Sequence, residues 1–291
     1  MHTAIQLTAV ALQIGAVYVL FSLGLTLIFG VMRIVNFAHG QFFTLSALVV
    51  AATTPMLVAQ GWTPGIAFTA SAVLAIALSV VFGFLMYQFG FRYLQRDFVG
   101  SFILSLGFLL FTEGLLLESF GGMVRSVPPL VEGTLDVLGT QMATQRLLLC
   151  VITVLLTAGL YAVLTLTRLG KALRAIAIDH EAAMLQGIPY RRLALTGFLI
   201  ATLVASVAGI LIAPISVVSP TIGNDYLIKG FIAVVIGGLG SVPGAILGSL
   251  FIAFVESIGG FFFDPSSASI AVFALVLLVL LVRPRGLLGN A

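Results

Sequence analysis

The residues of this chain with the clearest chemical potential are few, and they lie inside apolar sequence. Asn36 and His39 interrupt an apolar run, and Gly40 follows them. Neutral amide and imidazole groups can tie a broken helix together, which we favour, or hydrogen-bond a zwitterionic or neutral substrate. Glu256 lies within a later apolar stretch, where a carboxylate is a candidate for a functional pathway. The candidates for residues that line a pathway through the protein are therefore Asn36, His39, Gly40 and Glu256.

The usual catalytic and metal-binding spacings are absent from the sequence. It contains no His-Glu-x-x-His or Gly-x-Ser-x-Gly pattern and no paired intramembrane aspartates. No second His, Cys or carboxylate lies at ligand spacing from His39. A Gly-x-x-x-x-Gly-Lys-Ser/Thr phosphate loop is also missing. We expect no catalytic residue, metal or cofactor on this chain, so an enzyme is disfavoured.

A second group of residues, from Asp179 to Pro189, predicts a short helix with defined ends. Asp179 can accept a free backbone N–H of the first turn, and Glu181 in that turn favours the positive end of the helix dipole. Gly187 fits the position after the helix, and Pro189 blocks its continuation. A helix of about two turns is marginal alone in water, so we predict a partner protein that holds it in a groove. An exposed loop helix without a partner is the alternative, which the small residues of this stretch disfavour.

Composition places these residues in a polytopic membrane protein. The 291 residues are 60% hydrophobic and 8% charged, with a mean hydropathy of +1.23. Soluble domains average roughly 25% charged residues, so this chain has too few charges to cover a water-exposed surface. Because backbone polar groups must be paired within a membrane, long apolar runs without alternation predict helices. The fold class is therefore all-α and polytopic, and Cys150, the single cysteine, excludes an intrachain disulfide.

Apolar runs predict nine membrane segments, several of them irregular. They lie near 5–29, 41–59, 65–90, 98–120, 145–167, 193–217, 228–240, 244–262 and 269–283. The break at 30–40 is either an inner loop or a broken helix that faces a pore. The segment at 228–240 is too short for a clean span and reads as a half-helix or re-entrant piece. The loop at 121–144 forms a short strand or a docking surface, or it is a plain connecting loop.

Glycines and charges around the short segment suggest how it packs. Gly240, Gly244 and Gly248 fall four residues apart, so in a helix they would let another helix approach closely. Lys229 is expected near an outer edge, where it snorkels or pairs with Asp225.

Basic residues predict the orientation. Five of the thirteen lie in the loop at 166–193, between two nearly chargeless flanks. Placing this loop inside also places five more inside, namely Arg33, Arg92, Arg96, Arg283 and Arg285. The N-terminus is therefore expected outside and the C-terminus inside.

A resemblance to a known family now becomes visible. The pattern Glu-Ala-Ala-x-x-x-Gly resembles the coupling motif of ABC importer permeases, matched here by Glu181, Ala182, Ala183 and Gly187, with Asp179 before them. In that family the short helix docks in a cleft of the ATP-binding subunit. The resemblance therefore implies that residues 168–192 form a cytoplasmic coupling loop. The apolar-proline tail of the broadest form of this motif is not clear after Gly187.

Two more segments resemble the H-type permease of branched-chain amino acid importers. Residues 24–48 (GLTLIFGVMRIVNFAHGQFFTLSAL) are similar to the N-terminal signature of that family, and residues 228–250 (IKGFIAVVIGGLGSVPGAILGSL) to its second signature. The resemblance spans nearly the whole chain in the right order. It implies an ABC importer permease fold of about 8–10 transmembrane helices, some broken, in a single domain, 1–291.

The resemblance also implies partners and a location. They are a second, M-type permease subunit, two ATP-binding subunits that carry ATP and Mg, and an extracytoplasmic binding protein, all at a bacterial cytoplasmic (inner) membrane. Such relatives import branched-chain amino acids, and close kin carry urea, short amides or aromatic acids, so both substrate groups stay open. A stand-alone secondary transporter or channel is a further alternative, which Glu256 alone supports only weakly.

Overall fold

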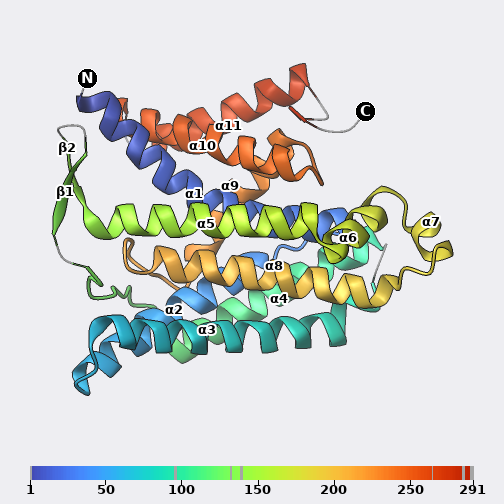
Figure 1. Ribbon diagram of the computed structural model, residues 1–291, viewed down its shortest axis with the longest axis horizontal. Helices are drawn as coiled ribbons and strands as arrows, with labels where there is room; N and C mark the ends of the chain where they lie inside the picture. Colours follow the sequence, from blue (N-terminus) through green and yellow to red (C-terminus); the bar gives the residue numbers. More distant parts are fainter. Residues whose placement is uncertain are drawn as a thin grey trace.

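The chain folds into a bundle of long helices, as its apolar runs predict (Figure 1). The computed structural model describes residues 2–94, 97–131, 133–137, 140–263, 265–283 and 286–288. Within these ranges, seven helices are long and apolar enough to cross a membrane. Two further helices of 16 and 18 residues belong to the same bundle. The predicted Arg96 and Arg285 lie outside the described residues.

The elements follow one another in a simple order. They are α1 (His2–Met32), α2 (His39–Ala59), α3 (Pro64–Met86) with a π-helical end η1 (Tyr87–Phe91), α4 (Phe98–Phe120), β1 (Thr134–Val137), β2 (Thr140–Ala143), α5 (Thr144–Leu166), α6 (Arg168–Ile178), α7 (His180–Leu185), α8 (Tyr190–Ile212), α9 (Ile222–Gly237), α10 (Val242–Phe262) and α11 (Pro265–Val282). The short segment expected at 228–240 thus begins six residues earlier. Its first turns carry polar residues that the hydropathy pattern assigns to a loop.

The bundle is built around α1. In the most apolar 18-residue stretch of α1, 83% is buried inside the bundle, against 17% in the corresponding stretch of α5. α1 contacts α5, α8, α9 and α10, so it forms the centre of the core. Aromatic side chains fill much of this core, and Phe42 packs edge-on against both Phe82 and Phe198. The positions of α2, α8 and α9 are therefore fixed by their contact with α1 and with one another.

The outer helices bury small residues and expose large apolar ones. The buried face of α3 has small residues at every fourth position, namely Ala67, Ser71, Ala75, Ser79 and Gly83. On the other face, Val73 and Val81 are 63% and 57% exposed. Small residues let neighbouring membrane helices approach closely, while large apolar residues suit lipid. This arrangement is the reverse of a soluble core and agrees with a membrane-spanning bundle.

The two ends of the bundle differ in structure. At one end β1 and β2 form an antiparallel hairpin in which Thr134 pairs with Ala143 (Figure 1). The loop at 121–144 thus contains strand structure, which was one of the alternatives that the sequence left open. Nearby, Arg125 and Val218 form an isolated bridge that connects this loop to the segment after α8. At the opposite end, the chain forms the short helices α6 and α7, of which α7 lies farthest from the hairpin (Figure 1).

Candidate functional site

The loop between α5 and α8 forms two short helices. α6 begins after Thr167, whose hydroxyl accepts the Gly170 N–H at 3.1 Å. Leu173 and Ile176 of α6 are buried, while its basic side chains are exposed. Of these two helices only α7 was predicted from the sequence, although the spacing of apolar and basic residues in α6 is typical of an amphipathic helix. Together α6 and α7 make an ordered projection at one end of the bundle.

The ends of α7 have the geometry that their residue types predict. Asp179 Oδ1 accepts the backbone N–H groups of Glu181 at 3.0 Å and of Ala182 at 3.1 Å. Gly187 has a φ of +80°, in the left-handed region that favours glycine, and its N–H donates to the Met184 carbonyl at 2.9 Å. The hydrogen bonds at its two ends therefore hold α7 in a defined helical shape, although the helix is short.

The predicted coupling residues face two directions. Ala183 is 5% exposed and packs against this chain, whereas Glu181, Ala182 and Gly187 face outward. Leu185 is 87% exposed at the end of α7. The small residues thus do not form one shared face, because Ala183 anchors α7 and its neighbours are presented to the surroundings. The exposed part combines a carboxylate with apolar surface, as an interface requires.

Basic side chains surround this projection. The five basic residues of the loop are all exposed, namely Arg168, Lys171, Arg174, Arg191 and Arg192. The end of α1 lies at the same level, since Arg33 shares a cavity of about 220 Å³ with Ile176 and His180. This end of the bundle therefore concentrates positive charge. Such a bias is typical of the cytoplasmic side of a membrane protein.

The predicted pathway residues of the first break are packed inside the bundle. Asn36 is 1% exposed, and its Oδ1 accepts the Ala38 N–H at 3.1 Å. His39 is fully buried, and its ring lies edge-on to Phe21 at 5.0 Å. Neither ring nitrogen has a hydrogen-bond partner of good geometry among the described residues, although the Phe21 carbonyl interacts weakly with the ring. In this conformation both side chains are enclosed at the break between α1 and α2, where the Asn36 oxygen satisfies one backbone N–H.

Gly40 lies where the first turns of α2 and α9 touch. A Cβ atom added to Gly40 would lie 2.6 Å from the Gly223 carbonyl oxygen. The Gly223 N–H donates to Thr44 Oγ1 at 3.0 Å. Next to this contact, Gln41 donates to Asn224 Oδ1 at 3.3 Å. Gly40 therefore serves close packing of two helix starts at this contact.

The polar chain that begins at Gln41 reaches a third helix. Asn224 Nδ2 donates to Glu113 Oε2 at 3.0 Å, so side chains of α2, α9 and α4 are linked. No local sequence pattern predicts these hydrogen bonds, because the three residues are far apart in the sequence. This polar chain satisfies polar groups that would otherwise be costly among apolar helices.

Glu256 has two partners on other helices. It forms an ion pair with Lys229 of α9, and its second oxygen accepts the Tyr18 hydroxyl of α1 at 2.6 Å. The Lys229 ammonium also lies 5.8 Å from the centre of the Tyr18 ring. The expected pairing of Lys229 with Asp225 was wrong, since the ion-pair partner of Lys229 is Glu256. The fold brings α10 beside α9, and this places Glu256 against the lysine.

The three predicted packing glycines do not lie on one helix. Gly240 has a φ of +82° and lies in the turn before α10, which begins at Val242. The expected single face is therefore corrected to two residues, Gly244 and Gly248. Both are buried at the contact with α9, where an added Cβ would meet the backbone of Gly237 or Ala233. The close helix approach is made by α9 and α10.

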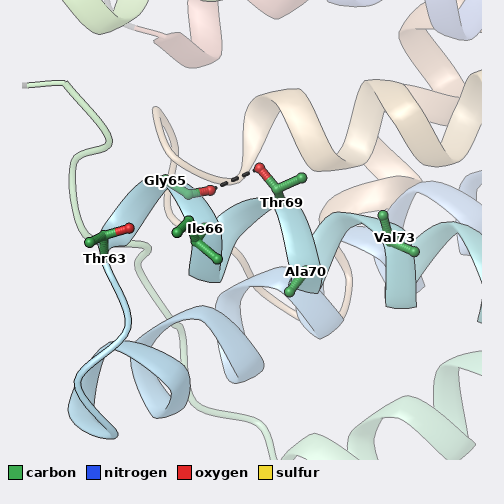
Figure 2. Close-up of a pocket in the computed structure, with 6 residues that line it drawn as sticks. All are labelled: Thr63, Gly65, Ile66, Thr69, Ala70 and Val73. Carbon is green, nitrogen blue, oxygen red and sulfur yellow. Dashed lines mark hydrogen bonds between the residues drawn. The ribbon is translucent and has the colours of Figure 1, made fainter.

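An open depression on α3 offers no comparable chemistry. Its lining runs along one face of the helix start, from Thr63 to Val73 (Figure 2). The Thr69 hydroxyl donates to the Gly65 carbonyl of the same helix at 2.8 Å. The six lining residues carry no charge. Among the described residues, no group of three or more His, Cys, Asp or Glu side chains is placed to hold a metal ion.

Comparison with known proteins accounts for this combination of features. Residues 7–282 match the family model described as branched-chain amino acid transport system / permease component. The chain is 29% identical to the high-affinity branched-chain amino acid transport system permease protein BraD of Pseudomonas aeruginosa, over 96% of this chain and 94% of that protein. It is 29% identical to the corresponding LivH protein of Escherichia coli, over 95% and 92% of the two chains. A solved structure, PsaBC from Streptococcus pneumoniae in complex with Fab, aligns with a TM-score of 0.46 and 14% identity over 98% of this chain and 93% of that chain. The chain therefore belongs to the family of permease components of branched-chain amino acid transport systems.

Proposed function

We propose that this chain is one permease subunit of an ATP-driven importer for branched-chain or related amino acids. Substrate crosses by alternating access between this subunit and a second, M-type permease. The energy comes from ATP and Mg bound to two partner ATP-binding subunits, and an extracytoplasmic binding protein delivers the substrate. Family membership supports this proposal, since relatives over nearly the whole chain are permeases of branched-chain amino acid transport systems.

The observation that carries the coupling role is the exposed helix α7. Its ends are fixed by Asp179 and Gly187, and Leu185 at its end is 87% exposed. A helix of this length gains stability when its apolar side is laid into a groove of a partner. α7 thus fits the ATP-binding subunit, with Glu181, Ala182 and Gly187 on the docked side and Ala183 as the anchor.

Docking of α7 on the ATP-binding subunit also determines how the chain is oriented in the membrane. The end that carries α6 and α7 also carries the exposed basic residues, so we place it in the cytoplasm. The hairpin end and the N-terminus then lie outside, and the C-terminus lies inside, in a bacterial inner membrane. The binding protein would approach the hairpin end.

Purification of the tagged chain from its native membrane tests the proposal. Mass spectrometry of the gently solubilised material should identify an ATP-binding subunit and a sister permease. The variant Leu185→Asp places a charge on the exposed end of α7, so it should reduce the recovered ATP-binding subunit by at least about tenfold, as expected for the loss of one buried anchor.

A matched variant controls for general effects of a new charge. Leu135→Asp changes an exposed leucine of β1, at the opposite end of the bundle. It should leave recovery of the ATP-binding subunit unchanged. Reproducible absence of any ATPase from the wild-type preparation would contradict the importer proposal, and equal recovery from wild type and Leu185→Asp would contradict docking through α7.

A further inference from the structure

A small cavity between α9, α10 and α11 combines charge with apolar walls. Its volume is about 120 Å³. Three charged side chains line it, namely Asp225, Lys229 and Glu256, together with apolar residues that include Ile228, Val272 and Phe273. The cavity is thus bounded by α9 and α10, which carry the ion pair of Lys229 and Glu256, and by α11, the last helix of the bundle.

One of the three charged side chains in this cavity has no hydrogen-bond or ion-pair partner among the described residues. Glu256 is held by Lys229 and by the Tyr18 hydroxyl, so both of its oxygens have partners. The side chains of Lys229 and Glu256 remain 28% and 22% exposed, so the pair is not sealed. Asp225 lies one helical turn before Lys229 on α9 and makes no hydrogen bond or ion pair to another described residue. One carboxylate is therefore left over beside an ammonium that has further donors available.

Position makes this leftover charge informative. Lys229 and Glu256 are partly buried between apolar helices, where charged side chains are costly and usually serve a function, and Asp225 lies exposed beside them in the first turn of α9. An ion pair that only fastened two helices would need one carboxylate, and Glu256 supplies it. The additional Asp225 gives the cavity a net negative charge when Lys229 is protonated.

A zwitterion complements this arrangement better than a simple ion. Its ammonium can pair with Asp225 while its carboxylate accepts hydrogen bonds from Lys229. A free anion would meet the net negative charge, and a metal cation would meet the adjacent ammonium. The apolar wall is suited to a hydrocarbon side chain. The cavity volume of about 120 Å³ is smaller than the roughly 150 Å³ that holds benzene, so the cavity takes only a branched side chain of about four carbons, and the ammonium and carboxylate lie at its edge beside Asp225 and Lys229.

We propose that this cavity is a binding site for a zwitterionic α-amino acid with a short aliphatic side chain. Asp225 holds the substrate ammonium, Lys229 holds its carboxylate, and Ile228, Val272 and Phe273 contact the side chain. Tyr18 positions Glu256, which keeps Lys229 in place. The proposal rests on the amino-acid importer function proposed above and assigns a substrate contact to this subunit.

Protection of a cysteine from labelling tests the site without relying on transport. In the purified importer complex, with Cys150→Ala as background, Phe273→Cys places a thiol in the cavity wall. Methyl methanethiosulfonate labels it, and the rate is compared with L-leucine, 4-methylpentanoate or 3-methylbutylamine present. L-Leucine should slow labelling, and each truncated probe should need at least about a tenfold higher concentration, because one charged contact is missing. A thiol at Phe251→Cys, on α10 outside the cavity lining, should not be protected.

Two variants separate a ligand site from a structural ion pair. Asp225→Asn should raise the leucine concentration for half-protection at least about tenfold with a nearly unchanged melting temperature, because Asp225 is exposed and has no hydrogen-bond or ion-pair partner among the described residues. Glu118→Gln, an exposed carboxylate of α4, should change neither quantity. Exchange of the pair by Lys229→Glu with Glu256→Lys should restore the melting temperature lost in either single variant, while protection by leucine stays lost.

Each outcome decides between the site and the wider function. Absence of leucine protection in a complex that couples ATP hydrolysis to leucine uptake would overturn the site and leave the importer proposal intact. Recovery of leucine protection in the exchanged pair, or equal protection by 4-methylpentanoate, would also overturn the site. Leucine protection in a preparation without any ATPase would support the site and contradict the importer.

Discussion

Gly40 and Gly223 bring the first turns of α2 and α9 into direct backbone contact. A Cβ atom on Gly40 would lie 2.6 Å from the Gly223 carbonyl oxygen, closer than real Cβ atoms approach. The Gly223 N–H is satisfied by the Thr44 hydroxyl across the same contact. Two helices that begin within the bundle are thus fastened to each other at their starts.

Enlarging this contact should destabilise the bundle. Gly40→Ala is expected to lower the free energy of unfolding by about 1–3 kcal/mol, because the added methyl group meets backbone that cannot move aside. The midpoint of thermal unfolding of the purified complex measures this effect. Gly107→Ala in α4 is the control, since an added Cβ there meets nothing within 4 Å. Equal midpoints for the two variants would show that α2 and α9 are not closely packed.

The cap of α7 should affect coupling rather than membrane insertion. Asp179→Ala removes the acceptor for two backbone N–H groups, at a cost of about 1 kcal/mol to the helix. Less substrate should then be transported for each ATP hydrolysed, whereas Asp179→Asn keeps a capping oxygen and should retain most of the coupling. The ratio of uptake to hydrolysis in reconstituted complex is the measurement. Loss of coupling in Asp179→Asn, with coupling retained in Asp179→Ala, would rule out a capping role.

The hydroxyl of Tyr18 should contribute to stability through Glu256. Tyr18→Phe removes a hydrogen bond of 2.6 Å to a carboxylate, so the free energy of unfolding should fall by about 1.5–3 kcal/mol. Tyr161→Phe, at a 41% exposed position of α5, should have little effect. Thermal unfolding of both variants in the same detergent distinguishes them. An unchanged midpoint for Tyr18→Phe would show that this hydrogen bond does not persist in the assembled protein.

The proposed orientation predicts which thiols are reached from outside. In a Cys150→Ala background, Leu135→Cys on the hairpin should react with an impermeant maleimide in spheroplasts. Leu185→Cys on α7 should react only after the membrane is permeabilised, because the basic end is placed inside. Both positions are exposed, at 51% and 87%. The reverse labelling pattern would invert the proposed topology.

Local sequence signals were enough to predict the long helices and the ends of α7, but α6 was missed. Apolar runs determine the long helices because a membrane span has a minimum length. Asp179 and Gly187 determine the ends of α7 because caps depend on neighbouring backbone. The predicted half-helix at the start of the second signature is present as α9, with an earlier beginning.

The contacts between distant segments could not be read in the same way. Lys229 lies four residues from Asp225, so sequence proximity favoured that pair, yet helix packing brings Glu256 beside the lysine. Gly240 follows the spacing of a helix face but lies in a turn with positive φ. Such relationships depend on which helices are neighbours, and a single sequence leaves that choice open.

Uptake of radiolabelled L-leucine into proteoliposomes tests the importer function most directly. The vesicles contain the complete complex, with ATP enclosed on the side of α7 and the binding protein added on the hairpin side. Leucine should accumulate only when ATP, the ATP-binding subunits and the binding protein are all present. Leu185→Asp should abolish this accumulation. The control Leu135→Asp should keep the ATP-binding subunit attached. Uptake by this chain alone, without ATP or partner proteins, would contradict the importer and indicate a stand-alone transporter.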